Sequence, residues 1–381
     1  MTGEIRFLHC GNGDTILIRG GDEWALVDAN LTARSGAVNR LEAILREHGV
    51  RRLRFVCVTH FDADHIRGLG RFLRKHFGPN DTDRDKWEIE QVILPVRPSR
   101  PFWRKLFCSK RQYQLFCGRD DDATTPFVEL FNELRDMGKR DHRIFPAYDP
   151  RTNLVSRDLC PTSASLGPWD VWFLGPSIEV EGRYMITFGN NPLKESTSRH
   201  EWPKILRRNV ERNETSKIIA LCHRETADTV LLTGDATAAS IEEALQQWAN
   251  VRFQAGMKPF RIVKASHHGA WTERPADNCH YDELYHQHCD TQHSEVVISC
   301  GNEDERHPHA NMIGCVQTKG IRSVSTGVPV ARPARQIGMG MPLGAPYDSY
   351  ASQPEDVIFR VVDGKSSLTG GHIRSPVRAS T

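Results

Sequence analysis

The stretch that decides the fold covers residues 53–65 and reads LRFVCVTHFDADH. Five of its first six residues are apolar, which predicts a short buried strand. Its last six residues hold four side chains that can bind a metal ion: His60, Asp62, Asp64 and His65. In an extended turn, residues two apart point the same way, so His60 and Asp62 can share one ion. Asp64 and His65 can then face a second ion close to the first.

Acidic or imidazole side chains also stand at the ends of three other apolar runs: Asp28, Asp235 and the pair His267-His268. Loops at strand ends are where sites gather, because the sheet holds them rigidly and leaves their side chains free. Two cations held close together need a bridging carboxylate, and Asp235 is the natural supplier. Imidazoles combined with carboxylates suit Zn²⁺, Mn²⁺ or Fe²⁺.

Each of these signals taken alone is more often structural than catalytic. A single His-x-Asp fits a surface turn, a Gly-Asp is common, and two adjacent histidines can simply stand near a helix start. Their joint occurrence at four strand ends of one chain is hard to ascribe to chance. The combination therefore predicts a metal site.

Predicted strands and helices alternate along most of the chain, which favours an α/β layered domain. Residues 97–150 interrupt this pattern with mixed helix and loop, including an amphipathic helix over residues 126–137. Residues 329–354 are rich in Gly and Pro and predict an irregular loop before a last strand over residues 356–362. We expect one domain spanning residues 1–381, with residues 97–150 as an insertion, rather than two independent cores.

Composition excludes little. A formal net charge of +2 favours neither nucleic acid nor membrane globally, so any electrostatic preference must be local. The sequence shows no leader peptide and no apolar stretch as long as a membrane span. The ten cysteines lack CxxC spacing, and Cys10, Cys57, Cys222 and Cys300 sit in or beside apolar runs, as small buried side chains do. We therefore expect a cytoplasmic protein without a membrane partner.

Residues 59–69 resemble, almost residue for residue, the Ser/Thr-His-x-Asp-Ala-Asp-His-Ile-x-Gly-Leu signature of the metallo-β-lactamase superfamily. The resemblance is closest to the hydrolase domain of ComEC-type DNA-uptake proteins and their free-standing relatives. Further matching motifs lie at residues 11–15, 26–29, 213–216, 267–270, 299–301 and 307–308. The resemblance covers most of the chain. It implies a four-layer αββα metallo-β-lactamase sandwich with a helical and loop insertion, and two divalent metal ions as cofactors.

The resemblance also implies roles for individual residues. Asp64, His65, Asp235 and His267 are expected to hold one ion, and His60, Asp62 and Asp235 the other. Asp28 is expected to orient a ligand histidine. Position in the chain alone makes His268 or His307 the candidate acid for the leaving oxygen. His267 is favoured as the ligand because it ends the strand, and His268 remains the alternative.

Two departures from the wider superfamily affect the second ion. Asp62 stands where many members carry a histidine, which makes the site richer in oxygen and favours Mn²⁺ over Zn²⁺. No histidine between Leu69 and Asp235 stands in the usual ligand context. The ComEC-like branch places Asn213 and Ser216 in that region, where they are expected to support the ligands.

Two basic segments are candidate substrate contacts. Residues 97–119 interleave cations, among them Arg104 and Lys105, with aromatic residues, and residues 199–212 include Lys204 and Arg207. Such a pattern can follow a phosphate backbone and stack bases. An amphipathic helix with a solvated basic face and an aromatic core face is the alternative for the first segment, and it is slightly favoured.

These features predict a dinuclear metal-dependent hydrolase, foremost a phosphodiesterase or nuclease that attacks nucleic acid through a hydroxide bridging the two ions. A hydrolase of a small ester, lactone or phosphoester is the alternative enzyme. A non-catalytic scaffold that retains the fold is the third possibility, and intact ligand motifs count against it. Nothing in the sequence identifies a protein partner.

Overall fold

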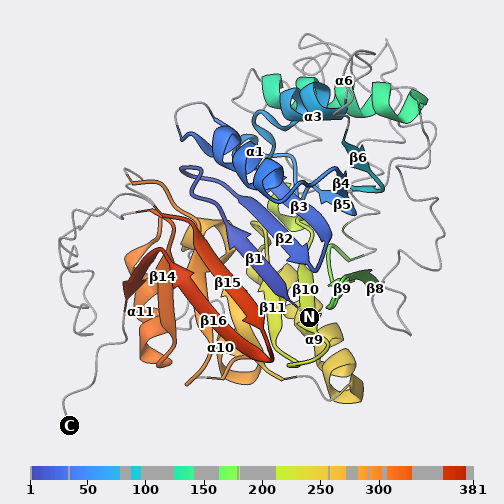
Figure 1. Ribbon diagram of the computed structural model, residues 1–381. Coiled ribbons are helices and arrows are strands. Elements are labelled where there is room, and N and C mark those ends of the chain that lie inside the picture. The colour runs from blue at the N-terminus through green and yellow to red at the C-terminus, as the bar shows by residue number, and fades with distance from the viewer. Residues whose placement is uncertain are drawn as a thin grey trace, which may run out of the picture.

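The computed structural model describes residues 2–32, 35–77, 87–95, 124–140, 163–177, 180, 212–255, 258–271, 282–290, 292–302, 307–327 and 355–374. Two large β-sheets lie against each other, and helices cover their outer faces (Figure 1). The loops that carry the predicted site residues come from both sheets.

The first sheet has seven strands in the order β16-β15-β1-β2-β3-β5-β7. Their bounds are β1 Gly3–Phe7, β2 Thr15–Gly20, β3 Glu23–Ala29, β5 Phe55–Cys57, β7 Val92–Ile93, β15 Val357–Val362 and β16 Lys365–Gly370. Strand β5 runs parallel to both of its neighbours, and the other pairs are antiparallel. Because Val27 pairs with Cys57, the carboxyl ends of β3 and β5 lie side by side, which brings Asp28 next to Thr59 and His60.

The second sheet has eight strands in the order β17-β14-β13-β12-β11-β10-β9-β8. Their bounds are β8 Ser163–Leu166, β9 Trp169–Phe173, β10 Ile219–His223, β11 Thr229–Leu232, β12 Phe260–Lys264, β13 Glu295–Ile298, β14 Arg322–Ser325 and β17 His372–Arg374. Strands β11 to β14 are parallel, so the loops after β11 and β12 open at the same edge. These two loops carry Asp235 and the His267-His268 pair.

Three apolar layers hold the molecule together. The middle layer lies between the sheets and includes Phe7 and Phe55 from the first sheet and Trp169 from the second. An outer layer joins the first sheet to α1, α3 and α6, and the other joins the second sheet to α9, α10 and α11. The helix bounds are α1 Ala37–Glu47, α2 Ala63–Ile66, α3 Leu69–Phe77, α6 Thr124–Arg140, α9 Ala238–Ala255, α10 Asp282–Gln287 and α11 Ala310–Thr318. This order of layers is the αββα arrangement that the sequence predicts.

Helix α6 is the described part of the predicted insertion, and it covers the amphipathic helix expected over residues 126–137. It packs on α3, where a side chain on Gly70 would meet the backbone of Glu129. The rings of Phe127 and Phe131 lie 5.4 and 5.1 Å from that of Phe61. The insertion therefore supports the metal-binding loop directly, because Phe61 stands between His60 and Asp62. The rest of residues 97–150, and residues 329–354, lie outside the described residues.

Local structure differs from the sequence prediction in three places. The strand expected over residues 53–58 is two strands, because the N–H of Arg54 donates to the carbonyl of Trp24 and separates β5 from β4 (Arg52–Leu53), which pairs instead with β6 (Glu88–Ile89). Ser35 is the residue that the sequence favours as the N-cap of α1, but Gly36 takes that position, although the Ser35 hydroxyl accepts a hydrogen bond from the N–H of Ala37. The last predicted strand is followed by β16 and β17, which the sequence analysis missed.

The cysteines predicted to be buried and free are so: Cys10, Cys57, Cys222 and Cys300. Cys315 is disulfide-bonded. Within the described residues, no helix combines the length and the apolar character that crossing a membrane requires. The cellular compartment stays a prediction.

Candidate metal centre

The metal-binding candidates meet where strand ends of the two sheets come together. The loop after β5 and the short helix α2 carry His60 to His65, and the loop after β11 carries Asp235. His267 and His268 lie in the 3₁₀ turn η4 (Ser266–Gly269), which follows β12. Sequence positions about 200 residues apart therefore form one cluster, as the sequence predicts.

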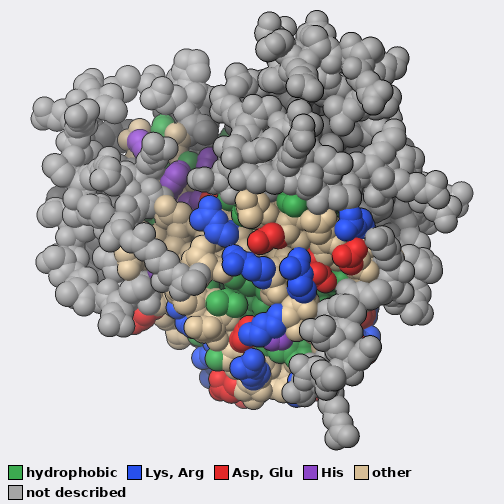
Figure 2. Space-filling view, turned by 90° about the horizontal axis from the view of Figure 1, so that it is seen from above, with side chains coloured by type: hydrophobic (Ala, Val, Ile, Leu, Met, Phe, Trp, Pro, Cys, Tyr) green, Lys and Arg blue, Asp and Glu red, His purple; other side chains and the backbone are tan. Residues whose placement is uncertain are grey.

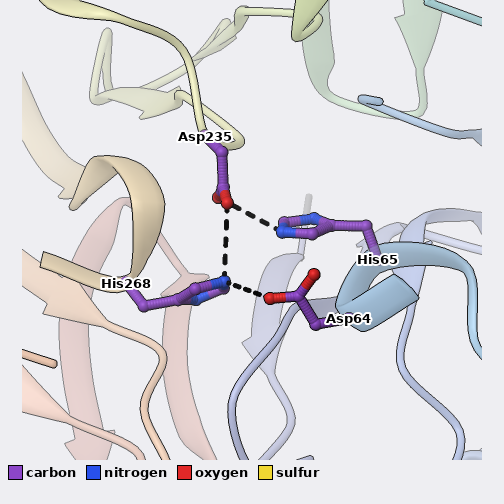
Figure 3. A group of neighbouring side chains, drawn as sticks. All are labelled: Asp64, His65, Asp235 and His268. Carbon is purple, nitrogen blue, oxygen red and sulfur yellow. Dashed lines mark hydrogen bonds and ion pairs between the residues drawn. The ribbon is translucent and has the colours of Figure 1, made fainter. Parts of the chain in front are cut away.

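Four side chains form its most compact part: Asp64, His65, Asp235 and His268 (Figure 3). One ligand atom from each lies within 4.8 Å of all the others. Nε2 of His65 is 3.2 Å from Oδ1 of Asp235, and Nε2 of His268 is 3.2 Å from Oδ2 of Asp64. Two ligands bound to one tetrahedral ion at about 2.0–2.1 Å lie about 3.4 Å apart. The spacing of the four groups thus fits a shared ion.

The other oxygen of Asp235 faces a second set of side chains. Its Oδ2 is 3.7 Å from Nε2 of His60 and 3.9 Å from Nε2 of His267. Nε2 of His60 is also 3.8 Å from Oδ2 of Asp62. These separations exceed hydrogen-bond length, so the groups approach one another without bonding directly. Asp235 stands between the two sets, as a bridging carboxylate must.

The backbone of η4 directs the two adjacent histidines differently. His267 and His268 have φ angles of 48° and 55°, in the left-handed region that residues with a side chain rarely adopt. Strain of this kind persists where surrounding structure enforces it and is frequent at functional sites. His268 is buried and turns its Nδ1 toward the carbonyl of Ser299 at 3.0 Å, while His267 is part-exposed. The pair can therefore serve two different positions.

Asp28 organises the loop after β5 in the manner predicted for it. Its Oδ2 lies 2.7 Å from Nδ1 of His65, which leaves Nε2 of that ring facing Asp235. The same carboxylate accepts hydrogen bonds from the N–H and the hydroxyl of Thr59, at 2.7 and 2.6 Å. A carboxylate that fixes a ligand imidazole in this way raises its basicity and sets its tautomer.

Several buried polar atoms at this site have no hydrogen-bond partner among the residues that the structure describes. They include Nε2 of His60, Nε2 of His65 and Oδ1 of Asp235. An unsatisfied polar atom in the interior is costly and is rarely tolerated without a function. Atoms of imidazole and carboxylate type, all turned toward one space, fit divalent metal ions. The side chains present therefore fit a metal centre.

Burial and neighbouring charges shift the pKa values of the side chains in the cluster strongly. Burial lowers the pKa of His65, but the carboxylates of Asp235 and Asp28 outweigh this and hold the pKa well above its ordinary value. Burial and the charge of His65 hold the pKa of His60 well below its ordinary value. For Asp235, burial acts upward on the pKa, and His65 and His268 bring it well below the usual range. An arriving cation would therefore replace a proton on His65, whereas it would meet a neutral imidazole at His60.

Two buried residues of the site were not predicted as such. Lys264, the last residue of β12, is fully buried, and its ammonium lies 2.5 Å from Oδ2 of Asp14. Asp14 is held over the loop by its N–H, which donates to the carbonyl of Asp64 at 3.2 Å. Gly13 permits this approach, because a Cβ there would lie 2.1 Å from the same oxygen. A signal existed in each case, since Asp14 lies in a quoted motif and Lys264 is a lone cation in the run Ile262–Ala265 just before the two histidines.

The remaining predicted residues divide into placed and unplaced ones. The amide nitrogen of Asn213 is 3.3 Å from Nδ1 of His267, and the hydroxyl of Ser216 accepts a hydrogen bond from the N–H of Asp235. The ring of His307 lies 5.5 Å from that of His267 and 6.1 Å from that of His268. The four predicted substrate contacts lie outside the described residues: Arg104, Lys105, Lys204 and Arg207.

Charges on the described surface are mixed. Figure 2 shows Lys and Arg side chains lying among Asp and Glu, with several histidine side chains gathered at a separate place. On α3, Lys75 contacts Glu42 and Arg74 contacts Glu133. The described part of this face therefore carries no uniformly basic track, and a preference for nucleic acid must come from elsewhere.

Comparison with known proteins gives one family match. Residues 9–89 match the model of the metallo-beta-lactamase superfamily, which spans Asp14, Asp28 and the motif from His60 to His65. With the two mixed sheets and their helices, this match confirms the predicted α/β metallo-β-lactamase fold. A ComEC-type relationship finds no support beyond the sequence motifs. No curated protein matches the chain.

Several solved structures are similar at low identity. The metallo-beta-lactamase fold protein YhfI from Bacillus subtilis is 12% identical, with 85% of this chain and 96% of that one covered and a TM-score of 0.37. Unliganded yeast PDE1 is 12% identical, with 85% of this chain and 97% of that one covered and a TM-score of 0.37. CmlA, a diiron β-hydroxylase from Streptomyces venezuelae, is 12% identical, with 84% of this chain and 52% of that one covered and a TM-score of 0.39. At such TM-scores, none of them bears on what this chain binds.

Proposed function

We propose that this member of the metallo-β-lactamase superfamily is a metal-dependent hydrolase whose preferred substrates are phosphodiesters, with nucleic acid foremost. The observation that carries the proposal is the buried group Asp64, His65, Asp235 and His268, whose ligand atoms lie within 4.8 Å of one another. Among the described residues, Nε2 of His65 and Oδ1 of Asp235 in this group find no hydrogen-bond partner although they are buried. Such a group is costly in a scaffold and useful in a metal enzyme.

We assign two ion positions to the cluster. The first lies among Asp64, His65, Asp235 and His268. The second lies among His60, Asp62, Asp235 and His267. This assignment moves His267 from the first position, where the sequence analysis put it, to the second. Both histidines of η4 approach Oδ2 of Asp235, but Nε2 of His268 also lies 3.2 Å from Oδ2 of Asp64 and so belongs to the first position, which leaves His267 beside His60. It also gives the second position a second histidine beside His60.

Asn213 can prepare His267 for this role. A half-turn of an amide exchanges its oxygen and its nitrogen, so Asn213 can accept a hydrogen bond from Nδ1–H of His267. The ring proton then stays on Nδ1, and Nε2 keeps its lone pair for an ion.

When bound, divalent ions would acidify a water molecule and neutralise charge on the substrate. The residues of the chain supply the rest of the chemistry. Asp235 keeps the two positions adjacent, and Asp28 holds His65 in its ligating tautomer. His307 lies beside both histidines of η4 and is the candidate donor of a proton to the leaving oxygen. The proposed donor set consists of carboxylates and imidazoles and includes no thiolate. Such a set suits ions that bind hard oxygen atoms, which favours substrates such as phosphates.

The proposal is tested by measuring metal content and hydrolysis together. The protein loaded with Mn²⁺ or Zn²⁺ is assayed on single-stranded DNA, duplex DNA, RNA, bis(p-nitrophenyl) phosphate and simple carboxylic esters. We expect metal-dependent cleavage of the phosphodiesters, abolished in Asp64→Ala. Asp290→Ala is a matched control, because this carboxylate is exposed and lies outside the cluster. Cleavage of esters alone would contradict the phosphodiesterase assignment, and failure to bind either ion would contradict the metal enzyme.

A further inference from the structure

Lys264 is a buried cation in the middle of the second sheet, beside the proposed metal centre. Its side chain is fully buried, and its ammonium makes three approaches. Nζ lies 2.5 Å from Oδ2 of Asp14, donates to the carbonyl of Gly234 at 2.9 Å, and is 3.6 Å from Oδ1 of Asp235. All three neighbours belong to loops of the candidate site.

Packing alone does not explain why a lysine occupies position 264. An ammonium transferred from water into a protein interior is strongly disfavoured unless it is paired and hydrogen-bonded. An apolar residue would fill the end of a central strand at less cost. Lys264 is paired in this way, because its ammonium contacts the carboxylate of Asp14 and approaches that of Asp235.

Lys264 also divides the two oxygens of Asp235 between different neighbours. Oδ1 faces Lys264 and His65, while Oδ2 faces His60, His267 and His268. A bridging carboxylate works only if its plane is fixed, because rotation would withdraw one oxygen from its ion. The ammonium acts on one oxygen alone and is itself held by Asp14, which comes from the opposite sheet.

We propose that Lys264 and Asp14 form a positioning pair that fixes the orientation of Asp235 and thereby sets the affinity of the centre for its ions. The inference rests on the proposed function, since it requires that the cluster bind metal. Lys264 touches no substrate in this role. It acts through Asp235, and through the carbonyl of Gly234 that anchors the same loop.

The pair is tested by removing both charges together. Lys264→Met alone leaves Asp14 as an unpaired buried carboxylate, so we expect that variant to melt well below the wild type or to misfold. Asp14→Asn/Lys264→Met keeps the net charge of the site and should recover much of the melting temperature. Asp14→Asn/Lys264→Gln is the second variant, since its two amides can still hydrogen-bond across the sheets.

The decisive readout is the dissociation constant for Zn²⁺, measured by competition with a chromophoric chelator, together with the number of ions bound. We expect each double variant to bind Zn²⁺ about 10-fold or more weakly than the wild type, as loss of a group that orients a ligand does. Arg261→Met/Glu295→Gln is the matched control. That ion pair begins on the same strand, contains a buried carboxylate, and stands three residues, roughly 10 Å, before Lys264.

The outcomes separate this inference from the proposed function. Zn²⁺ affinity that is unchanged in both folded double variants would reduce Lys264 and Asp14 to a structural ion pair and overturn the inference alone. Equal weakening in the Arg261/Glu295 control would overturn it as well, because the effect would then be general loosening of the sheet. A wild-type protein that binds no divalent ion would overturn the proposed function, and this inference with it.

Discussion

Two clusters of ionisable side chains, one on α1 and α3 and one at the strand ends of the two sheets, differ in how their polar atoms are satisfied. On α1 and α3, the buried carboxylate of Glu42 has contacts at 2.7 and 2.9 Å with Lys75, 3.0 Å with His76 and 3.3 Å with Arg46. At the strand ends, Nε2 of His60 and of His65 find no hydrogen-bond partner in the described part of the chain.

The difference separates a structural cluster from a ligand site. Glu42 is contacted by two cations, Lys75 and Arg46, and by the imidazole of His76, all within hydrogen-bond distance. In the proposed metal centre, carboxylates and imidazoles stand 3.2–3.9 Å apart around shared positions, too far in most cases to bond one another. A buried cluster whose polar atoms all bond one another needs no ligand. A buried cluster whose polar atoms do not bond one another is arranged to bind a ligand such as a metal ion.

The largest effect that would break this comparison comes from Asp235→Ala. Since Asp235 faces both ion positions, we expect loss of both ions and a fall in hydrolysis of about 10³-fold or more, on the order of 4 kcal/mol of transition-state stabilisation. Glu42→Ala is the matched control in the other cluster and should keep its full metal content. Elemental analysis and an activity assay measure both. Two ions retained in Asp235→Ala would refute the bridging role.

The two histidines of η4 sharpen the comparison within the metal centre. We expect His268→Ala and His267→Ala each to bind one ion instead of two, because each removes a ligand from a different position. His268→Ala should show the larger loss, since its ring is buried between Asp64 and Asp235. Metal stoichiometry after gel filtration measures this. Two ions in His267→Ala would return the second position to His60, Asp62 and Asp235 alone.

Removal of metal tests whether the unsatisfied atoms are a cost. Ions that bind only the folded state stabilise it by about 2.7 kcal/mol at a concentration 100 times the dissociation constant. We therefore expect chelation to lower the melting temperature by several degrees, and re-addition of metal to restore it. The same shift should appear in Glu42→Gln, because its cluster holds no ion. An unchanged melting temperature in the chelated wild type would contradict a tightly held ion.

Much of this arrangement could be predicted from the sequence. The run from His60 to His65 concentrates four ligands after an apolar strand, and Asp28 and Asp235 end apolar runs of their own, so strand-end geometry alone brings them together. Choosing between His267 and His268 was beyond such reasoning. Their directions depend on two left-handed backbone conformations that adjacent histidines do not announce.

Lys264 was missed for a different reason. A single lysine in an apolar run normally indicates a strand end that reaches solvent, and only the approach of Asp14 from the opposite sheet explains its burial. The strand around Arg54 was predicted wrongly for a similar reason. The N–H of Arg54 donates to the carbonyl of Trp24 in β3, and the predicted strand is divided there into β4 and β5. Contacts between distant segments decide such cases, and local pattern does not record them.

The smallest predicted effect concerns acid stability and the self-satisfied cluster. Burial raises the pKa of Glu42, but hydrogen bonds from Lys75 and His76 outweigh it and hold the pKa below the ordinary 4.5. Because Glu42 binds its proton less readily when folded than when unfolded, it stabilises the fold above pH 4.5, and this contribution is lost as the pH falls through the folded value. Glu42→Gln should remove that part of the acid dependence, which urea unfolding between pH 3 and pH 6 measures in both proteins. Parallel stability curves would show that the contacts of Glu42 carry no net preference for its charged form, and that a satisfied cluster can be electrostatically neutral to folding.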